Sequence, residues 1–260
     1  MRLEILLDAL EDFCPPGYAE TWDNCGLQAG RYDKEVARVY IALDATGEVI
    51  EKAADAGADL ILTHHPLLFD GIKHVTDRDF TGKRILEIIR RDMALYAMHT
   101  NFDVAAMADA AADMLSLKER AVLEVTGEDE KGPRGIGKLG RAEEPMTLME
   151  TAERVKKVFR IPSVRFYGDP SRVIGTIAIL PGSGKSEIDL ALHSGADVMI
   201  TGDVGHHAGI DAVEKGIAVI DAGHYGVEKL FVPYMKDWLG SRFPDLEIFL
   251  QEEKEYFTQI

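Results

Sequence analysis

The chain contains an internal repeat, and this repeat constrains the fold more than any other feature. Shifted by 138 residues, the segment 39–63 (VYIALDATGEVIEKAADAGADLILT) aligns without a gap with the segment 177–201 (IAILPGSGKSEIDLALHSGADVMIT). Each copy has an apolar run, a glycine-containing turn, a helical pattern, a Gly-Ala-Asp turn and a second apolar run that ends in threonine. The segments that follow, 93–103 and 217–228, also resemble each other. We therefore predict two related βαβ lobes that face each other across a pseudo-twofold axis.

Apolar runs alternate with helical patterns along the chain. Short apolar runs predict buried strands, and amphipathic spacing predicts helices. The expected strands are 39–43, 60–63, 93–98 and 164–167, and the expected helices are 2–13, 46–56, 82–91, 148–159 and 228–239. An alanine-rich helix is expected to end near residue 117. This alternation predicts an α/β fold with largely parallel sheets.

Two segments depart from this alternation. Residues 126–145 are rich in glycine and charge, which predicts a boundary between an N-terminal lobe (1–125) and a C-terminal lobe (126–260), with at most a short strand at 135–139. Residues 19–30 are also rich in turn-forming residues. There we expect a packed loop in which Trp22 fills the core.

Composition excludes several classes of protein. The 260 residues carry a formal net charge of −16, which disfavours binding to nucleic acid or to an anionic membrane. Cys14 and Cys25 are the only cysteines, too few for a disulfide framework or a cysteine zinc site. Residues 1–13 lack the basic start of a signal peptide, and no apolar run approaches the roughly 18 residues of a membrane span. We expect a cytoplasmic protein.

Polar side chains gather where the predicted strands end. The four clusters are His64-His65, His99 with Asp103, Asp203 with His206-His207, and His224 with Glu228. The remaining histidines, His74 and His193, are expected on the surface. In parallel α/β sheets ligands bind at the carboxyl ends of strands. Successive strand residues point to opposite faces, so a bend after Thr63 is needed to bring both imidazoles of the first cluster to one site.

The fourth cluster has the spacing of a metal site. A helix that begins near His224 places Glu228 one turn later on the same face. Imidazole and carboxylate ligands suit zinc, iron, manganese or nickel. The alternative is that these are ordinary hydrogen-bonded groups, with His64 in the core and His65 on the surface.

The segment 181–186 (PGSGKS) looks like the end of a phosphate-binding loop, but Ile179 stands where the full motif requires glycine. This disfavours an ATPase. Lys185 remains a candidate contact for an anion at the start of the next helix.

Six motifs together resemble the Nif-three-like family of dinuclear-metal proteins, which includes type 2 GTP cyclohydrolase I homologues. They are AETWDNCGLQAG (19–30), IALDAT (41–46), THHPLLFDGIKHV (63–75), AMHTNFD (97–103), TGDVGHHA (201–208) and DAGHYGVEKL (221–230). The resemblance implies that two divalent ions (zinc, iron or manganese) are bound by His64, His65, Asp103, His224 and Glu228. It also implies a metal site between the lobes and a hexameric ring of subunits. The chain resembles the short form of the family, which has no inserted middle domain.

The resemblance leaves two functions open. One is a metal-dependent hydrolase in which a metal-bound hydroxide opens the imidazole ring of GTP and releases formate. His99 would then move protons, and Lys185 and Arg134 are candidate cations for the triphosphate. The other is a metal-binding or regulatory scaffold without turnover.

Overall fold

The computed structural model describes residues 1–130 and 132–257, and it divides into two compact units. Unit 1 consists of residues 1–102 and 231–260, and unit 2 of residues 103–230. The sequence predicted a single crossing near residue 125. In the structure the chain leaves unit 1 after residue 102 and returns at residue 231, because its last strand pairs with a strand of unit 1.

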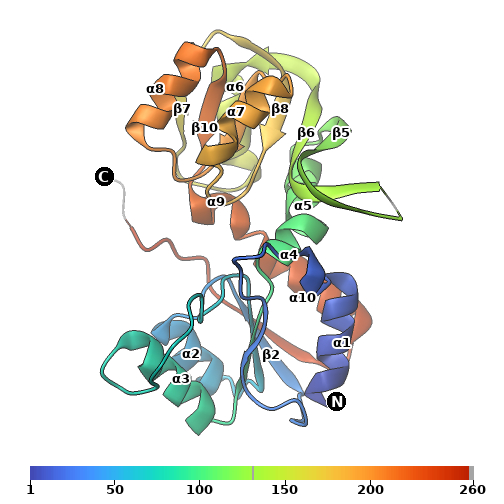
Figure 1. The fold of residues 1–260 in the computed structure, drawn as a ribbon, viewed down its shortest axis with the longest axis vertical. Coiled ribbons are helices and arrows are strands. Elements are labelled where there is room, and N and C mark those ends of the chain that lie inside the picture. The colour runs from blue at the N-terminus through green and yellow to red at the C-terminus, as the bar shows by residue number, and fades with distance from the viewer. Residues whose placement is uncertain (131, 258–260) are drawn as a thin grey trace. The chain divides into compact units, whose positions relative to one another are not determined.

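Unit 1 is built on a five-stranded sheet in the order β1-β4-β3-β2-β11. Its strands are β1 (Gly26–Ala29), β2 (Arg38–Ala42), β3 (Leu60–Thr63), β4 (Ala94–Ala97) and β11 (Glu247–Leu250). Its α-helices are α1 (Leu3–Phe13), α2 (Gly47–Asp55), α3 (Phe80–Arg90), the short α4 (Thr100–Phe102) and α10 (Phe231–Arg242). Only β1 runs antiparallel to its neighbour. In Figure 1, α2 and α3 cover one face of the sheet, and α1 and α10 cover the other.

The core of unit 1 explains why its central strands are almost wholly apolar. Parallel strands that carry helices on both faces are buried on both faces, and β3 and β4 are buried at every position. Alternate residues such as Tyr40, Ile61 and Leu95 pack in one cluster with Ile50 of α2 and Ile88 of α3. The predicted strands and helices of this half are thereby confirmed to within a few residues.

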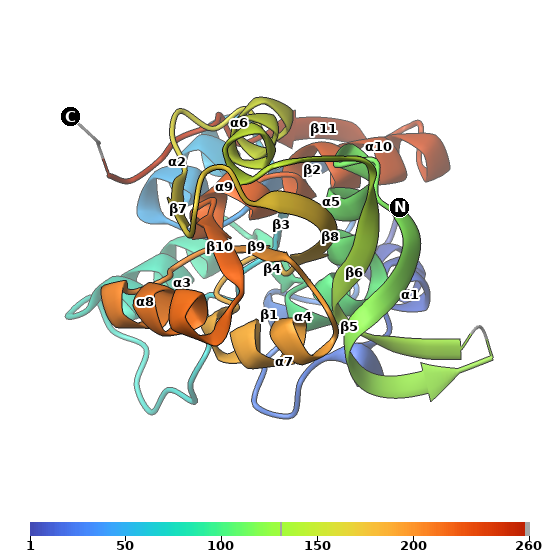
Figure 2. The same ribbon diagram turned by 90° about the horizontal axis from the view of Figure 1, so that it is seen from above.

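Unit 2 is built on a six-stranded sheet in the order β5-β6-β8-β9-β10-β7. Its strands are β5 (Lys118–Asp129), β6 (Gly132–Thr147), β7 (Arg165–Tyr167), β8 (Val173–Ile179), β9 (Val198–Thr201) and β10 (Ala218–Asp221). Its helices are a π-helical turn (Asp103–Met107), α5 (Ala108–Met114), α6 (Leu148–Val158), a 3-10 turn (Lys185–Glu187), α7 (Ile188–His193), α8 (His206–Lys215) and α9 (His224–Glu228). Figure 2 shows α6 on one side of this sheet and α7 and α8 on the other.

The two sheets differ in how far they are parallel. In unit 2 the parallel strands are β8, β9 and β10, whereas β5, β6 and β7 pair antiparallel to their neighbours. The protein is therefore a mixed α/β protein. The repeat is visible as β2-α2-β3 in unit 1 and β8-α7-β9 in unit 2, and both copies pair their two strands in parallel.

The prediction of a polar boundary at 126–145 was wrong. Residues 126–129 belong to β5 and residues 132–145 to β6, which pair antiparallel, and β6 extends well beyond the short strand expected at 135–139. Glycine and charged residues mislead here because the outer part of the hairpin is largely exposed and needs few apolar side chains. Gly135 has a packing role: a Cβ atom there would lie 1.8 Å from the carbonyl oxygen of Glu124 on the paired strand.

The helix predicted at 228–239 corresponds to α10 and is separate from the short helix α9 that carries His224. The helix α9 ends at Glu228, and α10 begins at Phe231. Pro233 accounts for the break, because in a continuous helix its ring would clash with the carbonyl of Lys229, whereas proline is tolerated in a first turn. Among the described residues, no helix combines the length and the apolar character needed to span a membrane.

Candidate metal centre

Unit 1 brings three histidines together at the ends of two neighbouring strands. His64 and His65 follow β3, and His99 lies two residues after β4. The strands are parallel, with Thr63 opposite Ala97, so their carboxyl ends meet at one edge of the sheet. The imidazole ring centroids lie 4.9, 5.2 and 5.5 Å apart, and ligand-capable nitrogens of all three rings lie within 4.8 Å of one another.

The bend predicted after Thr63 is present. The strand β3 ends at this residue, whose hydroxyl donates a hydrogen bond of 2.9 Å to the carbonyl oxygen of His65. The His64 ring is buried, and the His65 side chain keeps 21% of its surface exposed. The neighbouring rings therefore point to one place although adjacent strand residues would point apart.

The orientation of the three rings is set by hydrogen bonds at Nδ1. Each Nδ1 lies 2.8 Å from an oxygen: the carbonyl of Met98 for His64, Asp44 Oδ1 for His65, and Asp23 Oδ1 for His99. A carbonyl or an ionised carboxylate can only accept, so in each case Nδ1 donates. A neutral ring then keeps its lone pair on Nε2. Histidines that ligate metals are held in this way.

The sequence did not identify Asp23 as a functional residue. Its side chain is fully buried and accepts hydrogen bonds from His99 Nδ1, from the backbone N–H of Thr100 (3.0 Å) and from the Thr100 hydroxyl. Burial alone would raise the pKa of this carboxyl, but the hydrogen bonds from His99 and Thr100 outweigh it and hold the pKa well below its usual range. Asp23 is therefore a carboxylate that fixes the His99 ring.

The expectation that Trp22 fills the core was wrong. Its side chain is 57% exposed, while its neighbour Asp23 points inward. In the sequence, the most conspicuous features of the motif 19–30 are its turns and its tryptophan. The buried carboxylate within it was the more informative residue.

Unit 2 places a histidine and a carboxylate one helical turn apart. The helix α9 begins at His224, as the spacing predicted, and His224 Nε2 lies 3.0 Å from Glu228 Oε2. Glu228 is 3% exposed. His224 Nδ1 lies 2.8 Å from Asp203 Oδ2, so this ring has the same carboxylate support as His65 and His99. Asp203 thus supports the ring, while His206 and His207 of the same predicted cluster are exposed.

Glycines allow three loops of unit 2 to meet around this pair. A Cβ atom on Gly182, which has a φ of +76°, would lie 2.4 Å from Glu228 Oε1. A Cβ atom on Gly202 would lie 2.5 Å from the backbone nitrogen of His224. The loop that carries Gly182 also carries Lys185, which is exposed. In this loop the N–H of Gly184 donates to the hydroxyl of Thr201 at 2.8 Å.

The remaining predicted ligand, Asp103, opens the π-helical turn that continues the helical segment after α4. π-helical turns of this kind are frequent at functional sites. His74 and His193 are exposed, as expected.

The residues present fit a divalent metal ion. The donors are imidazole nitrogens and carboxylates, which zinc, iron and manganese accept. Nδ1 of His64, His65 and His224 lies 2.8 Å from an oxygen in each case. In unit 1 ligand-capable nitrogens of the three rings lie within 4.8 Å of one another, and in unit 2 Nε2 of His224 lies 3.0 Å from Glu228 Oε2.

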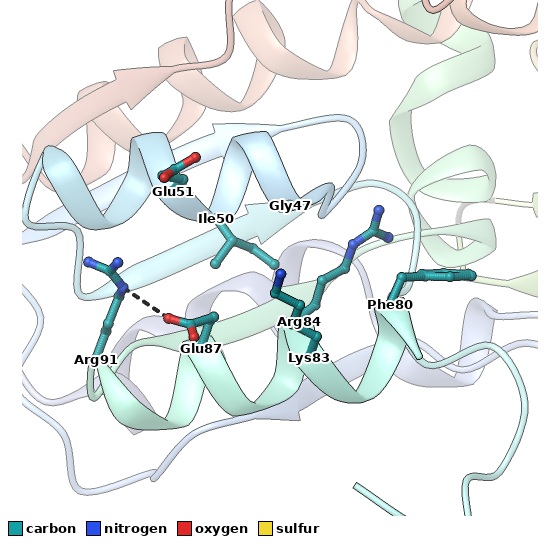
Figure 3. Close-up of a pocket in the computed structure, with 8 residues that line it drawn as sticks. All are labelled: Gly47, Ile50, Glu51, Phe80, Lys83, Arg84, Glu87 and Arg91. Carbon is teal, nitrogen blue, oxygen red and sulfur yellow. Dashed lines mark hydrogen bonds and ion pairs between the residues drawn. The ribbon is translucent and has the colours of Figure 1, made fainter. Parts of the chain in front are cut away.

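A cavity of about 500 Å³ lies elsewhere in unit 1, between α2 and α3. In Figure 3 Ile50 of α2 faces it from one helix, and Phe80, Lys83 and Arg84 line it from the other. Its lining contains no histidine or cysteine and none of the predicted site residues. The histidine cluster is a separate feature.

Comparison with known proteins places the chain in a family. The family model described as Duf34/NIF3 (NGG1p interacting factor 3) matches residues 1–255. A Clostridium acetobutylicum protein named "GTP cyclohydrolase 1 type 2 homolog" is 36% identical over 230 residues, covering 88% of this chain and 85% of that protein. A Methanocaldococcus jannaschii protein of the same name is 35% identical over 255 residues, covering 95% and 98%.

The fold also matches the folds of solved protein structures. A hypothetical protein of Staphylococcus aureus superposes with a TM-score of 0.90 at 30% identity, covering 100% of this chain and 99% of that one. The reduced form of the HcgD protein of M. jannaschii superposes with a TM-score of 0.83 at 32% identity, covering 97% and 98%.

Proposed function

The chain belongs to the Duf34/NIF3 family, and from this premise we propose that it is a dinuclear-metal-dependent hydrolase that opens the imidazole ring of GTP. The observation that supports this most strongly is the orientation of the histidines. Nδ1 lies 2.8 Å from an oxygen in His64, His65, His99 and His224, which fixes each ring in the way that metal-binding histidines are held. The names of the curated relatives supply the substrate class.

The proposed ligands are the five residues that the family resemblance implied. They are His64 and His65 of unit 1, and Asp103, His224 and Glu228 of unit 2. That residues of both units hold the same ions stays a prediction. Two divalent ions supply a nucleophile at neutral pH, because a metal lowers the pKa of water bound to it.

Other residues of the chain would orient the metal ligands or exchange protons with the substrate water. Asp44 and Asp203 hold the rings of His65 and His224. We propose that His99, held by Asp23, receives and returns the proton of the reacting water at Nε2, since an imidazole nitrogen can accept and donate a proton. Lys185 would contact the triphosphate.

The reaction is the addition of water at C8 of the purine, cleavage of the C8–N9 bond, and hydrolysis that releases C8 as formate. The test is formate release from GTP by protein reconstituted with zinc, iron or manganese. We expect release that depends on metal and that Glu228→Ala abolishes. A fully metallated protein that releases no formate would reject the hydrolase.

The alternative is a metal-binding scaffold that acts through other proteins. One observation favours it: the description of the matching family names an interacting factor rather than a reaction. A scaffold would bind the same ions through the same residues. It would show full metal content, no formate release and no other turnover of GTP.

We also propose that the subunits form a hexamer, as the resemblance implied. In the structure Trp238 stacks on Phe13 of α1 with ring centroids 4.9 Å apart, and Arg242 lies over its ring. This supports a role inside unit 1, so the contacts of a hexamer would use other surfaces.

A further inference from the structure

Two large aromatic side chains lie exposed beside the histidine cluster of unit 1. Trp22 is 57% exposed and Phe69 is 50% exposed, and their ring centroids lie 5.8 Å apart. The two residues come from different loops, one before β1 and one after β3. Both rings also lie edge to face with the imidazole of His99, with centroids 6.1 and 6.4 Å from it. The pair therefore borders the site.

The loops that carry these rings are joined to each other. The Asn24 side chain donates to the carbonyl oxygen of Leu68, and the Leu68 N–H donates to Gln28 Oε1 at 2.8 Å. Asp23, next to Trp22, is held by His99 and Thr100. The two aromatic rings are thus held in place before any ligand arrives, which reduces the entropy lost when a ligand binds.

The geometry of the pair suits a flat ring. The Trp22 and Phe69 planes are tilted by 42°, so the rings do not stack face to face and much of each remains open to solvent. An exposed aromatic face binds a nucleobase by stacking and needs no hydrogen bond for it. A compound that has a phosphate but no aromatic ring would lack this stacking contact.

We propose that Trp22 and Phe69 form the platform on which the planar heteroaromatic ring of the ligand stacks, and that they place this ring next to His99. This rests on the proposed function, because it assigns the residues that recognise the purine of the substrate. Trp22 and Phe69 are specificity-determining residues: they bind and position the ring, and the metal ligands are separate from them.

Fluorescence offers a direct test, because Trp22 and Trp238 are the only tryptophans. The Trp238→Phe variant retains an aromatic ring for stacking on Phe13 and leaves Trp22 as the one indole. We expect guanosine 5′-monophosphate to quench its fluorescence, and ribose 5-phosphate, which lacks the base, to leave it unchanged. Equal quenching by both compounds, or none by either, would overturn the proposal.

Binding measured by calorimetry completes the test. We expect Trp22→Leu to weaken binding of guanosine 5′-monophosphate by about 5- to 150-fold, the range of one lost stacking contact. Trp22→Tyr should restore most of the affinity. Tyr32→Leu, which removes an aromatic side chain that is 61% exposed and outside the pair, is the matched control and should bind normally.

The outcomes separate this inference from the hydrolase. If GTP yields no formate but the nucleotide still quenches Trp22, the platform stands and the hydrolase falls. If Trp22→Leu binds nucleotide and hydrolyses GTP with an unchanged KM, the hydrolase stands and the platform falls. Normal nucleotide binding by Trp22→Leu with smaller particles in sedimentation would assign the pair to a subunit contact and overturn the proposal.

Discussion

Replacing Asp23 by asparagine tests how the structure holds His99. The Asp23 carboxylate accepts from His99 Nδ1 at 2.8 Å and from the Thr100 N–H at 3.0 Å, and its side chain is fully buried. The amide of asparagine has one oxygen and one NH₂ group, so it can accept at only one of these two positions. The other donor then faces an NH₂ group.

The expected cost follows from the contact that is lost. A hydrogen bond to a charged group contributes about 1.5–3 kcal/mol. We therefore expect Asp23→Asn to lower the free energy of unfolding by about 2 kcal/mol. If the NH₂ group turns toward His99, Nδ1 must accept, the proton moves to Nε2, and Nε2 can no longer receive a proton from the reacting water. Loss of a group that transfers a proton in this way lowers a reaction rate by about 10²- to 10⁴-fold.

Urea denaturation of the metal-free protein measures the first effect, and formate release from GTP by metal-reconstituted protein measures the second. The control is Asp33→Asn, whose carboxylate is 73% exposed and contacts Arg31 at 3.4 Å. An exposed pair of this kind contributes little, and we expect a change below about 0.5 kcal/mol. Equal stability of the two variants, together with normal formate release by Asp23→Asn, would refute the role given to Asp23.

Three further predictions concern other parts of the chain. Gly182→Ala should displace the Glu228 carboxylate and lower the metal content measured by elemental analysis. The control is Gly195→Ala, where φ is a similar +84° but no atom lies within 4 Å of the added Cβ, so only stability should fall. Equal metal content in the two variants would contradict this. Burial raises the pKa of the Cys25 thiol to about 12. At pH 8 its alkylation by iodoacetamide should therefore be on the order of 10³-fold slower than that of an ordinary thiol, and the rate should rise tenfold per pH unit. A rate that reaches a plateau near pH 8.5 would refute this prediction. Trp238→Glu should destabilise unit 1, because a charge would replace the ring stacked on Phe13; smaller but fully stable particles in sedimentation velocity would instead show a subunit contact.

The features that the sequence predicted well are those carried by local patterns. The repeat and its apolar runs predicted β2-α2-β3 and β8-α7-β9 because buried parallel strands are apolar at every position. The pairing of His224 with Glu228 followed from helical spacing alone. The convergence of His64, His65 and His99 followed from the rule that parallel strands end at one edge of the sheet.

The features that the sequence missed depend on contacts between distant segments. Asp23 and His99 are 76 positions apart, and no periodicity connects them. The return of β11 to pair with β2 joins residues more than 200 positions apart, so the last strand could not be assigned to unit 1. The prediction that the Trp22 side chain is buried was wrong because hydrophobic residues are buried on average, but no single residue is required to be.

The central claim is that this chain binds divalent metal through the predicted histidines and carboxylates, and elemental analysis of protein purified without chelator tests it most directly. Wild-type protein should contain about two equivalents of zinc, iron or manganese per chain, as dinuclear centres do. His65→Ala and Glu228→Ala should each contain markedly less, while His193→Ala, which removes an exposed histidine outside both clusters, should match the wild type. Metal-free wild-type protein that stays metal-free after incubation with these ions, or full occupancy in Glu228→Ala, would contradict the account.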